Sequence, residues 1–190
     1  MPKFIEKEKG KMEILVLKSS GNKKGSSAML ADEFIRGAKE NGHSIIEYDL
    51  IGKDIRPCRG CNACGMNGPC VQKDDYENEL KGLIKKADML VFAMPVYYYN
   101  WPAQLKCVID RFYSFTGELT GMHKKTVLLG VAWDDSDVVF DVTERYYKRI
   151  CEYMQFNDCG SVIGRGCGTP SMTGGSVYPK EAYELGRSIK

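Results

Sequence analysis

Four of the chain's eight cysteines stand close together, with the spacing C-x2-C-x2-C-x5-C. They are Cys58, Cys61, Cys64 and Cys70. Thiols at this spacing can point into one concave loop, which is typical of cysteines that hold a [4Fe–4S] cluster. Arg56 and Arg59 would offset the negative charge of such a site. Structural zinc sites usually pair two cysteine knuckles set well apart, so zinc fits less well. A loop without any metal stays open.

A second segment, residues 18–27, is rich in hydroxyl groups and reads Lys-Ser-Ser-Gly-Asn-Lys-Lys-Gly-Ser-Ser. It has neither the G-x-G-x-x-G fingerprint nor the Walker pattern that binds nucleotides with magnesium. A helix that starts at Ser26 or Ser27 would offer backbone amides to an anion. We therefore expect a terminal monophosphate to bind there without a metal. The alternative is an ordinary flexible loop that ends in a serine cap.

A third segment, residues 93–102, places three tyrosines and a tryptophan between a strand and a helix. Loops at such positions are normally polar, so the aromatic residues suggest a partner. A flat aromatic ligand or a second subunit would account for them. A hydrophobic patch packed under the cysteine loop is the alternative.

Short apolar runs alternate with amphipathic stretches along the chain. The expected strands cover 12–18, 43–50, 88–94, 126–133 and 155–163, and the expected helices 27–41, 75–86, 102–112, 138–153 and 179–189. This pattern predicts an α/β fold, a doubly wound five-stranded parallel sheet in three layers. Residues 164–178 are expected to be structureless. We expect one domain over residues 1–190, with an N-terminal arm at 1–11 and a Cys-rich loop at 52–74.

Three motifs, in their order along the chain, resemble the NADPH-dependent FMN reductase branch of the flavodoxin-like superfamily. They are Met94-Pro-Val-Tyr97, Pro102-Ala-Gln-Leu-Lys106 and Ile109-Asp-Arg111. The hydroxyl-rich loop resembles that family's phosphate loop, although Gly21-Asn22 stands where Pro-Arg is usual. The cysteine spacing is similar to the compact motif of iron–sulfur flavoproteins, which are relatives of these reductases. The resemblance covers nearly the whole chain and implies a flavodoxin-like fold.

This resemblance implies that FMN binds at three loops. The residues implied for its phosphate are Ser20, Asn22, Gly25, Ser26 and Ser27. Those implied for its ring and ribityl chain are Pro95, Val96, Tyr97, Tyr98, Asn100 and Trp101, with Ala132, Trp133 and Asp134 on the far side. The implied activity is electron transfer from NAD(P)H to a quinone, a nitro or azo compound, or a flavin. Members of this family usually form homodimers or tetramers, and the resemblance implies the same for this chain.

Composition excludes other classes of function. The net charge is +2 and the lysines are scattered, which gives no electrostatic case for nucleic acid. The apolar runs are too short to cross a membrane. Residues 1–11 are charged and lack the apolar core of a signal peptide, so we expect a cytoplasmic protein.

Three functions remain open from the sequence. The first is an FMN-dependent oxidoreductase, in which the flavin carries the chemistry and no protein acid or base is needed. The second is an electron carrier with a cluster on the four cysteines of the loop. The third is a flavin-free sensor or binding domain whose cysteines respond to metal or oxidant.

Overall fold

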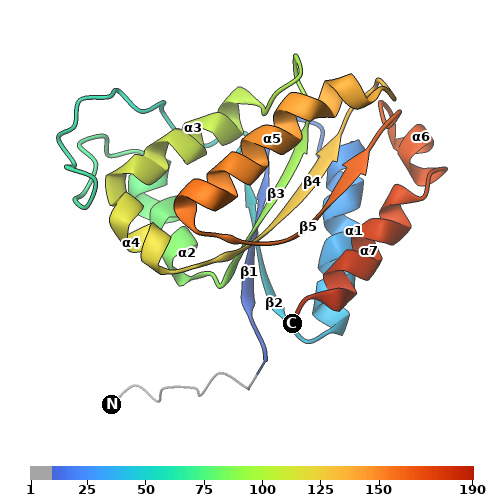
Figure 1. Cartoon of the computed structure of the whole chain (residues 1–190), viewed down its shortest axis with the longest axis horizontal. Coiled ribbons are helices and arrows are strands. Elements are labelled where there is room, and N and C mark those ends of the chain that lie inside the picture. Colours follow the sequence, from blue (N-terminus) through green and yellow to red (C-terminus); the bar gives the residue numbers. More distant parts are fainter. Residues whose placement is uncertain (1–9) are drawn as a thin grey trace.

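The computed structural model describes residues 10–190 and folds them around one five-stranded sheet (Figure 1). The strands are β1 (Glu13–Lys18), β2 (Ser44–Asp49), β3 (Met89–Pro95), β4 (Lys125–Val131) and β5 (Asn157–Gly164). All neighbours run parallel in the order β2-β1-β3-β4-β5, which is the flavodoxin-like order. The predicted doubly wound sheet is therefore confirmed, and its order reverses beside β1.

Helices cover both faces of the sheet, which confirms the three layers (Figure 1). They are α1 (Ser26–Glu40), α2 (Lys81–Lys86), α3 (Ala103–Arg111), α4 (Thr116–Gly121), α5 (Asp137–Met154), α6 (Pro170–Gly174) and α7 (Tyr178–Ser188). A π-helical turn, η1 (Tyr76–Leu80), precedes α2, and a 3-10 turn, η2 (Phe112–Phe115), follows α3. In Figure 1, α1, α6 and α7 lie on one side of the sheet and α2 to α5 on the other.

The core has two halves because successive side chains of each strand point to opposite faces. Leu15 and Phe92 are buried with the helices of the α3 and α5 layer. Val16 and Val91 are buried with α1 on the other face. This double burial is why the strands are nearly continuous apolar runs in the sequence.

Two predicted boundaries need correction. The stretch 164–178 was expected to be structureless, but it contains α6. Thr169 caps this helix by accepting a hydrogen bond from the amide of Met172 at 3.2 Å, and Pro170 occupies its first turn. The helix predicted from Pro102 ends at Arg111, and the separate turn and helix that follow it were not expected.

The predicted Cys-rich loop, residues 52–74, connects β2 to η1 without regular secondary structure. In Figure 1 it extends beyond α3 at the left edge of the molecule. Most of the predicted N-terminal arm, residues 1–11, lies outside the described residues, and the assignment of 1–190 to one domain stays a prediction. Within residues 10–190, none of the helices combines the length and the apolar character needed to cross a membrane.

Candidate functional site

The hydroxyl-rich loop leaves β1 and opens directly into α1. Gly25 precedes the helix in an extended conformation and provides no side-chain cap. The first helical hydrogen bond runs from the amide of Met29 to the carbonyl of Gly25 at 3.0 Å. The backbone amides of the helical residues before Met29 therefore have no acceptor within the helix. Free amides at the start of a helix are the arrangement that binds phosphate.

Asn22 folds this loop from within. Its carbonyl oxygen accepts from the amide of Gly25 at 3.0 Å, and its side-chain oxygen accepts from the amide of Lys24 at 3.1 Å. The amide of Asn22 donates to the hydroxyl of Ser20 at 3.2 Å. The loop is thus shaped by local hydrogen bonds before any ligand binds.

Ser26 stands out among the residues of this loop. Its hydroxyl oxygen is buried and has no hydrogen-bond partner among the described residues. An unsatisfied buried polar group costs about 1–3 kcal/mol, so native structures rarely keep one without a reason. A phosphate oxygen at the start of α1 would satisfy it.

Ser26 lines a cavity of about 360 Å³ beyond the carboxyl ends of the strands. The cavity lining comes from the loops after β1, β3, β4 and β5, and it comprises Ser20, Asn22, Gly25, Ser26, Ser27, Pro95, Val96, Tyr97, Val131, Ala132, Trp133, Cys167 and Gly168. Ten of these residues match the positions implied for FMN. We call this space the three-loop cavity, because the loops after β1, β3 and β4, at which the resemblance implies FMN contacts, meet in it.

Four of the implied residues do not line this cavity. The implied contact of the Trp101 side chain with FMN needs correction. Its indole is only 5% exposed and packs in the core, with its ring centre 5.2 Å from that of Phe92. Tyr98 points into solvent and is 99% exposed. The side chains of Asn100 and Asp134 accept hydrogen bonds from nearby backbone amides, at 2.8 Å and 2.7 Å respectively.

The tyrosine loop forms a tight hairpin, in which Tyr97 and Asn100 exchange two backbone hydrogen bonds of 3.0 and 3.1 Å. Between them, Tyr98 and Tyr99 have φ angles of +46° and +64°. Bulky residues rarely adopt this left-handed conformation, which costs about 1–2 kcal/mol per residue. Strain of this kind concentrates at functional sites.

The opposite wall is built by a contact that the sequence analysis missed. A Cβ atom on Gly168 would lie 2.1 Å from Cε3 of Trp133, so the indole of Trp133 rests directly on the Gly168 backbone. Hydrogen bonds from Cys167 to Ala132 (2.7 Å) and from Ala132 to Gly164 (3.0 Å) hold the two segments together. Trp133 remains 69% exposed, and one of its faces is therefore available to a ligand.

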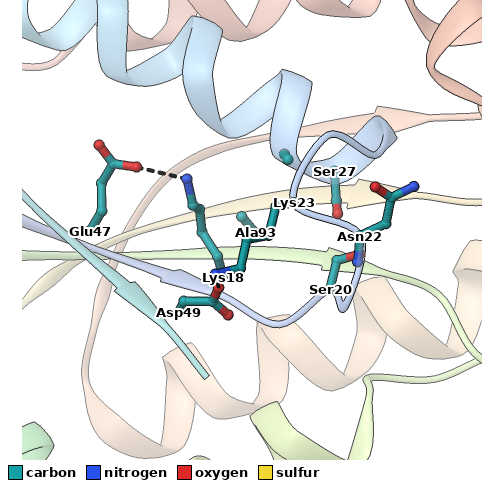
Figure 2. A pocket seen from close by; sticks show the side chains of 9 residues that line it. Lys18, Ser20, Asn22, Lys23, Ser27, Glu47, Asp49 and Ala93 are labelled. Carbon is teal, nitrogen blue, oxygen red and sulfur yellow. Dashed lines mark hydrogen bonds and ion pairs between the residues drawn. The ribbon is translucent and has the colours of Figure 1, made fainter. Parts of the chain in front are cut away.

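A second cavity of about 260 Å³, drawn in Figure 2, shares Ser20, Asn22 and Ser27 with the first. Lys18 and Glu47 form an ion pair of 2.7 Å in it, and Asp49 and Lys23 lie nearby. Burial lowers the pKa of Lys18, but the contacts with Glu47 and Asp32 outweigh burial and raise it. The hydroxyl-rich loop is thus a wall shared by the two cavities.

The four cysteines of the loop line a separate cavity of about 20 Å³, together with Arg59, Asn62, Val71, Gln72, Arg111, Tyr113 and Ser114. None of the cysteines forms a disulfide. Within residues 10–190, no three His, Cys, Asp or Glu side chains converge as ligands of a single metal ion do. The four cysteines nevertheless line one cavity, and thiolates are the ligands that a [4Fe–4S] cluster takes.

One buried ion pair closes the neck of this loop. Nη1 of Arg111 donates to Asp74 at 2.7 Å and to the carbonyl of Arg56 at 3.0 Å, while Nη2 reaches the carbonyl of Gln72 at 3.5 Å. Gln72 in turn donates to the carbonyl of Pro57 at 3.0 Å. Burial would raise the pKa of Asp74, but the hydrogen bonds from Arg111 and the amide of Arg56 keep that pKa below its usual value.

Comparison with known proteins fits this geometry. The family model described as flavodoxin-like fold matches residues 12–176. An iron-sulfur flavoprotein of Archaeoglobus fulgidus is 34% identical over 94% of this chain and 79% of its own length. The chain belongs to the flavodoxin-like family, on the branch of the iron-sulfur flavoproteins. The family resemblance predicted from the motifs is therefore confirmed.

Two further matches cover less of the chain or have lower identity. An FMN-dependent NADH:quinone oxidoreductase of Shewanella sp. (strain ANA-3) is 38% identical over 51% of this chain, which spans 53% of that relative. The solved NAD(P)H:quinone oxidoreductase from Methanothermobacter marburgensis aligns over 95% of this chain and 96% of its own, with a TM-score of 0.68. At 20% identity, that structure supports the fold alone.

Proposed function

We propose that this flavodoxin-like protein is an FMN-dependent oxidoreductase that passes electrons from NAD(P)H to a small acceptor. The unpartnered hydroxyl of Ser26 at the start of α1 carries this proposal, because it marks the place of an anion. The names of its relatives add support, since they include FMN-dependent NADH:quinone oxidoreductases and iron-sulfur flavoproteins.

The residues of the three-loop cavity have separable tasks in this proposal. Ser26 and the free amides at the start of α1 would hold the phosphate of FMN. Tyr97 and Trp133 would flank its flat ring and exclude water from one side of it. Bound FMN supplies the hydride and electron chemistry, which is why the site needs no protein acid or base.

The finer assignments belong to the same proposal. Acceptors with a flat conjugated system, such as quinones, azo or nitro compounds and flavins, would suit the exposed face of Trp133. The exposed rings of Tyr97, Tyr98 and Tyr99 would be covered in a homodimer or tetramer. We place the protein in the cytoplasm.

A titration of the flavin-free protein with FMN and with riboflavin tests the phosphate assignment. Ser26→Ala should weaken FMN binding about ten- to a hundredfold, since hydrogen bonds to charged groups contribute about 1.5–3 kcal/mol. Riboflavin has no phosphate, so its affinity should not change. Ser161→Ala, at an exposed position of β5, is the matched control. A protein that takes up no FMN at all would favour the flavin-free sensor instead.

A second candidate function adds a [4Fe–4S] cluster on Cys58, Cys61, Cys64 and Cys70, so that the protein carries single electrons. The observation that favours it is the gathering of all four thiols around one cavity beside the buried guanidinium of Arg111. Anaerobic purification should then give close to four iron and four sulfide per chain. Cys61→Ser with Cys64→Ser should remove the cluster absorbance and leave flavin bound.

A further inference from the structure

The second cavity has no role in the binding of FMN proposed above. It lies at the carboxyl ends of β1 and β2, beside the hydroxyl-rich loop and the first turn of α1. In Figure 2, Glu47 and Asp49 lie on the side of β2. Ser20, Asn22 and Ser27 lie on the side of the loop and α1. Two unlike sets of polar groups therefore face one space.

This space is continuous with the three-loop cavity, because Ser20, Asn22 and Ser27 line both. These residues stand where the start of α1 would hold the phosphate of FMN. A ligand with its phosphate at that point can extend into the three-loop cavity on one side and into the second cavity on the other. With volumes of about 360 and 260 Å³, the two cavities together have the size of ordinary cofactor sites, about 300–1,000 Å³.

Ser27 gives an independent sign that a ligand enters here. It is only 3% exposed, and its side chain makes no hydrogen bond within residues 10–190. Buried hydroxyls in native structures are normally paired. Because Ser27 lines both cavities, a polar group of a ligand at their junction would satisfy it.

Asp49 is an acceptor held in place at the far side of the second cavity. Its Oδ1 accepts from the backbone amide of Ile51 at 2.9 Å, which fixes the side chain at the end of β2. Its Oδ2 lies 3.6 Å from Nζ of Lys23, beyond hydrogen-bond distance. The carboxylate is 31% exposed. A ligand can therefore reach an oxygen that is already oriented.

The charges of the lining indicate what kind of ligand fits. Lys18 and Lys23 are matched by Glu47 and Asp49, so the cavity has no excess of either sign. Lys18 is itself paired with Glu47 at 2.7 Å. A balanced lining of this kind gives no advantage to a second free anion, and it suits a neutral group that carries hydroxyls, such as a sugar.

We propose that the second cavity holds the ribose of an adenosine joined to the flavin through its phosphates, so that the protein binds FAD as well as FMN. This inference rests on the proposed function, since it needs the phosphate at the start of α1. Oδ2 of Asp49 would accept from the ribose hydroxyls. Dinucleotide-binding α/β folds use the same arrangement, with the pyrophosphate at the first helix and a later acidic residue on the ribose.

Titration of the flavin-free protein with FMN and with FAD, followed by flavin fluorescence, tests this. Wild type should bind FAD at least as tightly as FMN. Asp49→Asn keeps an oxygen for the amide of Ile51 but removes the open carboxylate oxygen, so FAD affinity should fall about tenfold and FMN affinity should not change. Loss of a negative charge near a diphosphate would by itself strengthen binding, so a weaker affinity reports the lost hydrogen bond.

Asp32→Asn is the matched control. Asp32 lies 3.5 Å from Nζ of Lys18 but does not line the second cavity. The variant removes the same charge from the same neighbourhood, and it should not weaken FAD binding. An FAD analogue with 2′,3′-dideoxyadenosine lacks the hydroxyls that Asp49 would bind. Wild type and Asp49→Asn should therefore bind this analogue equally well.

Three results would overturn the proposal while the FMN assignment stands. One is wild type that binds FMN but excludes FAD. Another is an equal loss of FMN and FAD affinity in Asp49→Asn, which would mean that Asp49 shapes the phosphate loop. The third is an Asp49→Asn variant with unchanged FAD affinity but a raised KM for NADH when loaded with FMN, which would assign the cavity to the adenosine of the nicotinamide substrate. Protein that takes up neither flavin would overturn the proposed function as well.

Discussion

The hydroxyl-rich loop and the cysteine loop follow adjacent strands, β1 and β2, but they are held in different ways. The first folds on its own backbone and continues directly into α1, so its shape depends on bonds between residues a few positions apart. The second is held at its neck by Arg111 and Asp74, which lie 37 positions apart in the sequence. Local bonding makes the first loop robust, whereas the second depends on one long-range ion pair.

Removing Asp74 should therefore have the largest effect of any single change discussed here. Asp74→Ala leaves the buried charge of Arg111 unpaired, which typically costs about 3–5 kcal/mol. Chemical denaturation measures this loss. Glu118→Ala breaks an exposed pair with Lys85 and should cost under about 1 kcal/mol. Similar losses in both variants would contradict the special role of the neck.

Acid should weaken the same ion pair. Because the pKa of Asp74 is lower in the folded protein than in the unfolded chain, its contribution to stability is complete above the unfolded value of about 4. The contribution is lost as the pH falls through the lower, folded pKa. Stability measured from pH 5 downward should fall more steeply in wild type than in Asp74→Asn, which cannot titrate. Parallel curves would exclude Asp74 as the source.

The wall that Trp133 forms in the three-loop cavity depends on close packing rather than on charge. Gly168→Ala would put a Cβ 2.1 Å from the Trp133 indole and force the ring to move. Overpacking of this kind costs about 1–3 kcal/mol of folding stability, and because the displaced indole lines the three-loop cavity, FMN affinity should fall as well. Flavin fluorescence during titration measures it. Gly82→Ala in α2, where nothing lies within 4 Å of the new Cβ, should leave FMN binding unchanged.

The fold was readable from the sequence because each buried strand, such as the run around Val91 and Phe92, is apolar on both faces. The start of α1 was readable for a similar reason, since Ser26 and Ser27 stand where a hydroxyl-rich loop meets an amphipathic helix. These features depend on neighbours in the chain. Their positions therefore follow from local patterns.

The remaining features depend on residues far apart in the sequence. Gly168 matters only because Trp133, from another loop, rests on it. Trp101 was misplaced because residue type does not show which way a side chain turns after a hairpin, and Tyr98-Tyr99 lacks the Asn-Gly signature of such a turn. The pairing of Arg111 with Asp74 likewise has no sequence signal.

The smallest expected effect concerns the hairpin at Tyr97–Asn100. A substitution there tests whether its strained backbone contributes to binding. Asn tolerates positive φ better than Tyr, so Tyr98→Asn should stabilise the protein by about 0.5–1 kcal/mol and raise Tm by about 1–4 °C. Tyr153→Asn, an equally simple loss of an exposed ring but in helix α5, should give no such gain. A gain in stability together with weaker assembly or slower NAD(P)H oxidation would mean that the strained conformation is kept because it presents Tyr98 to a partner. A loss of stability would instead mean that Tyr98 is favoured by contacts within its own chain, and the strain would need no functional explanation.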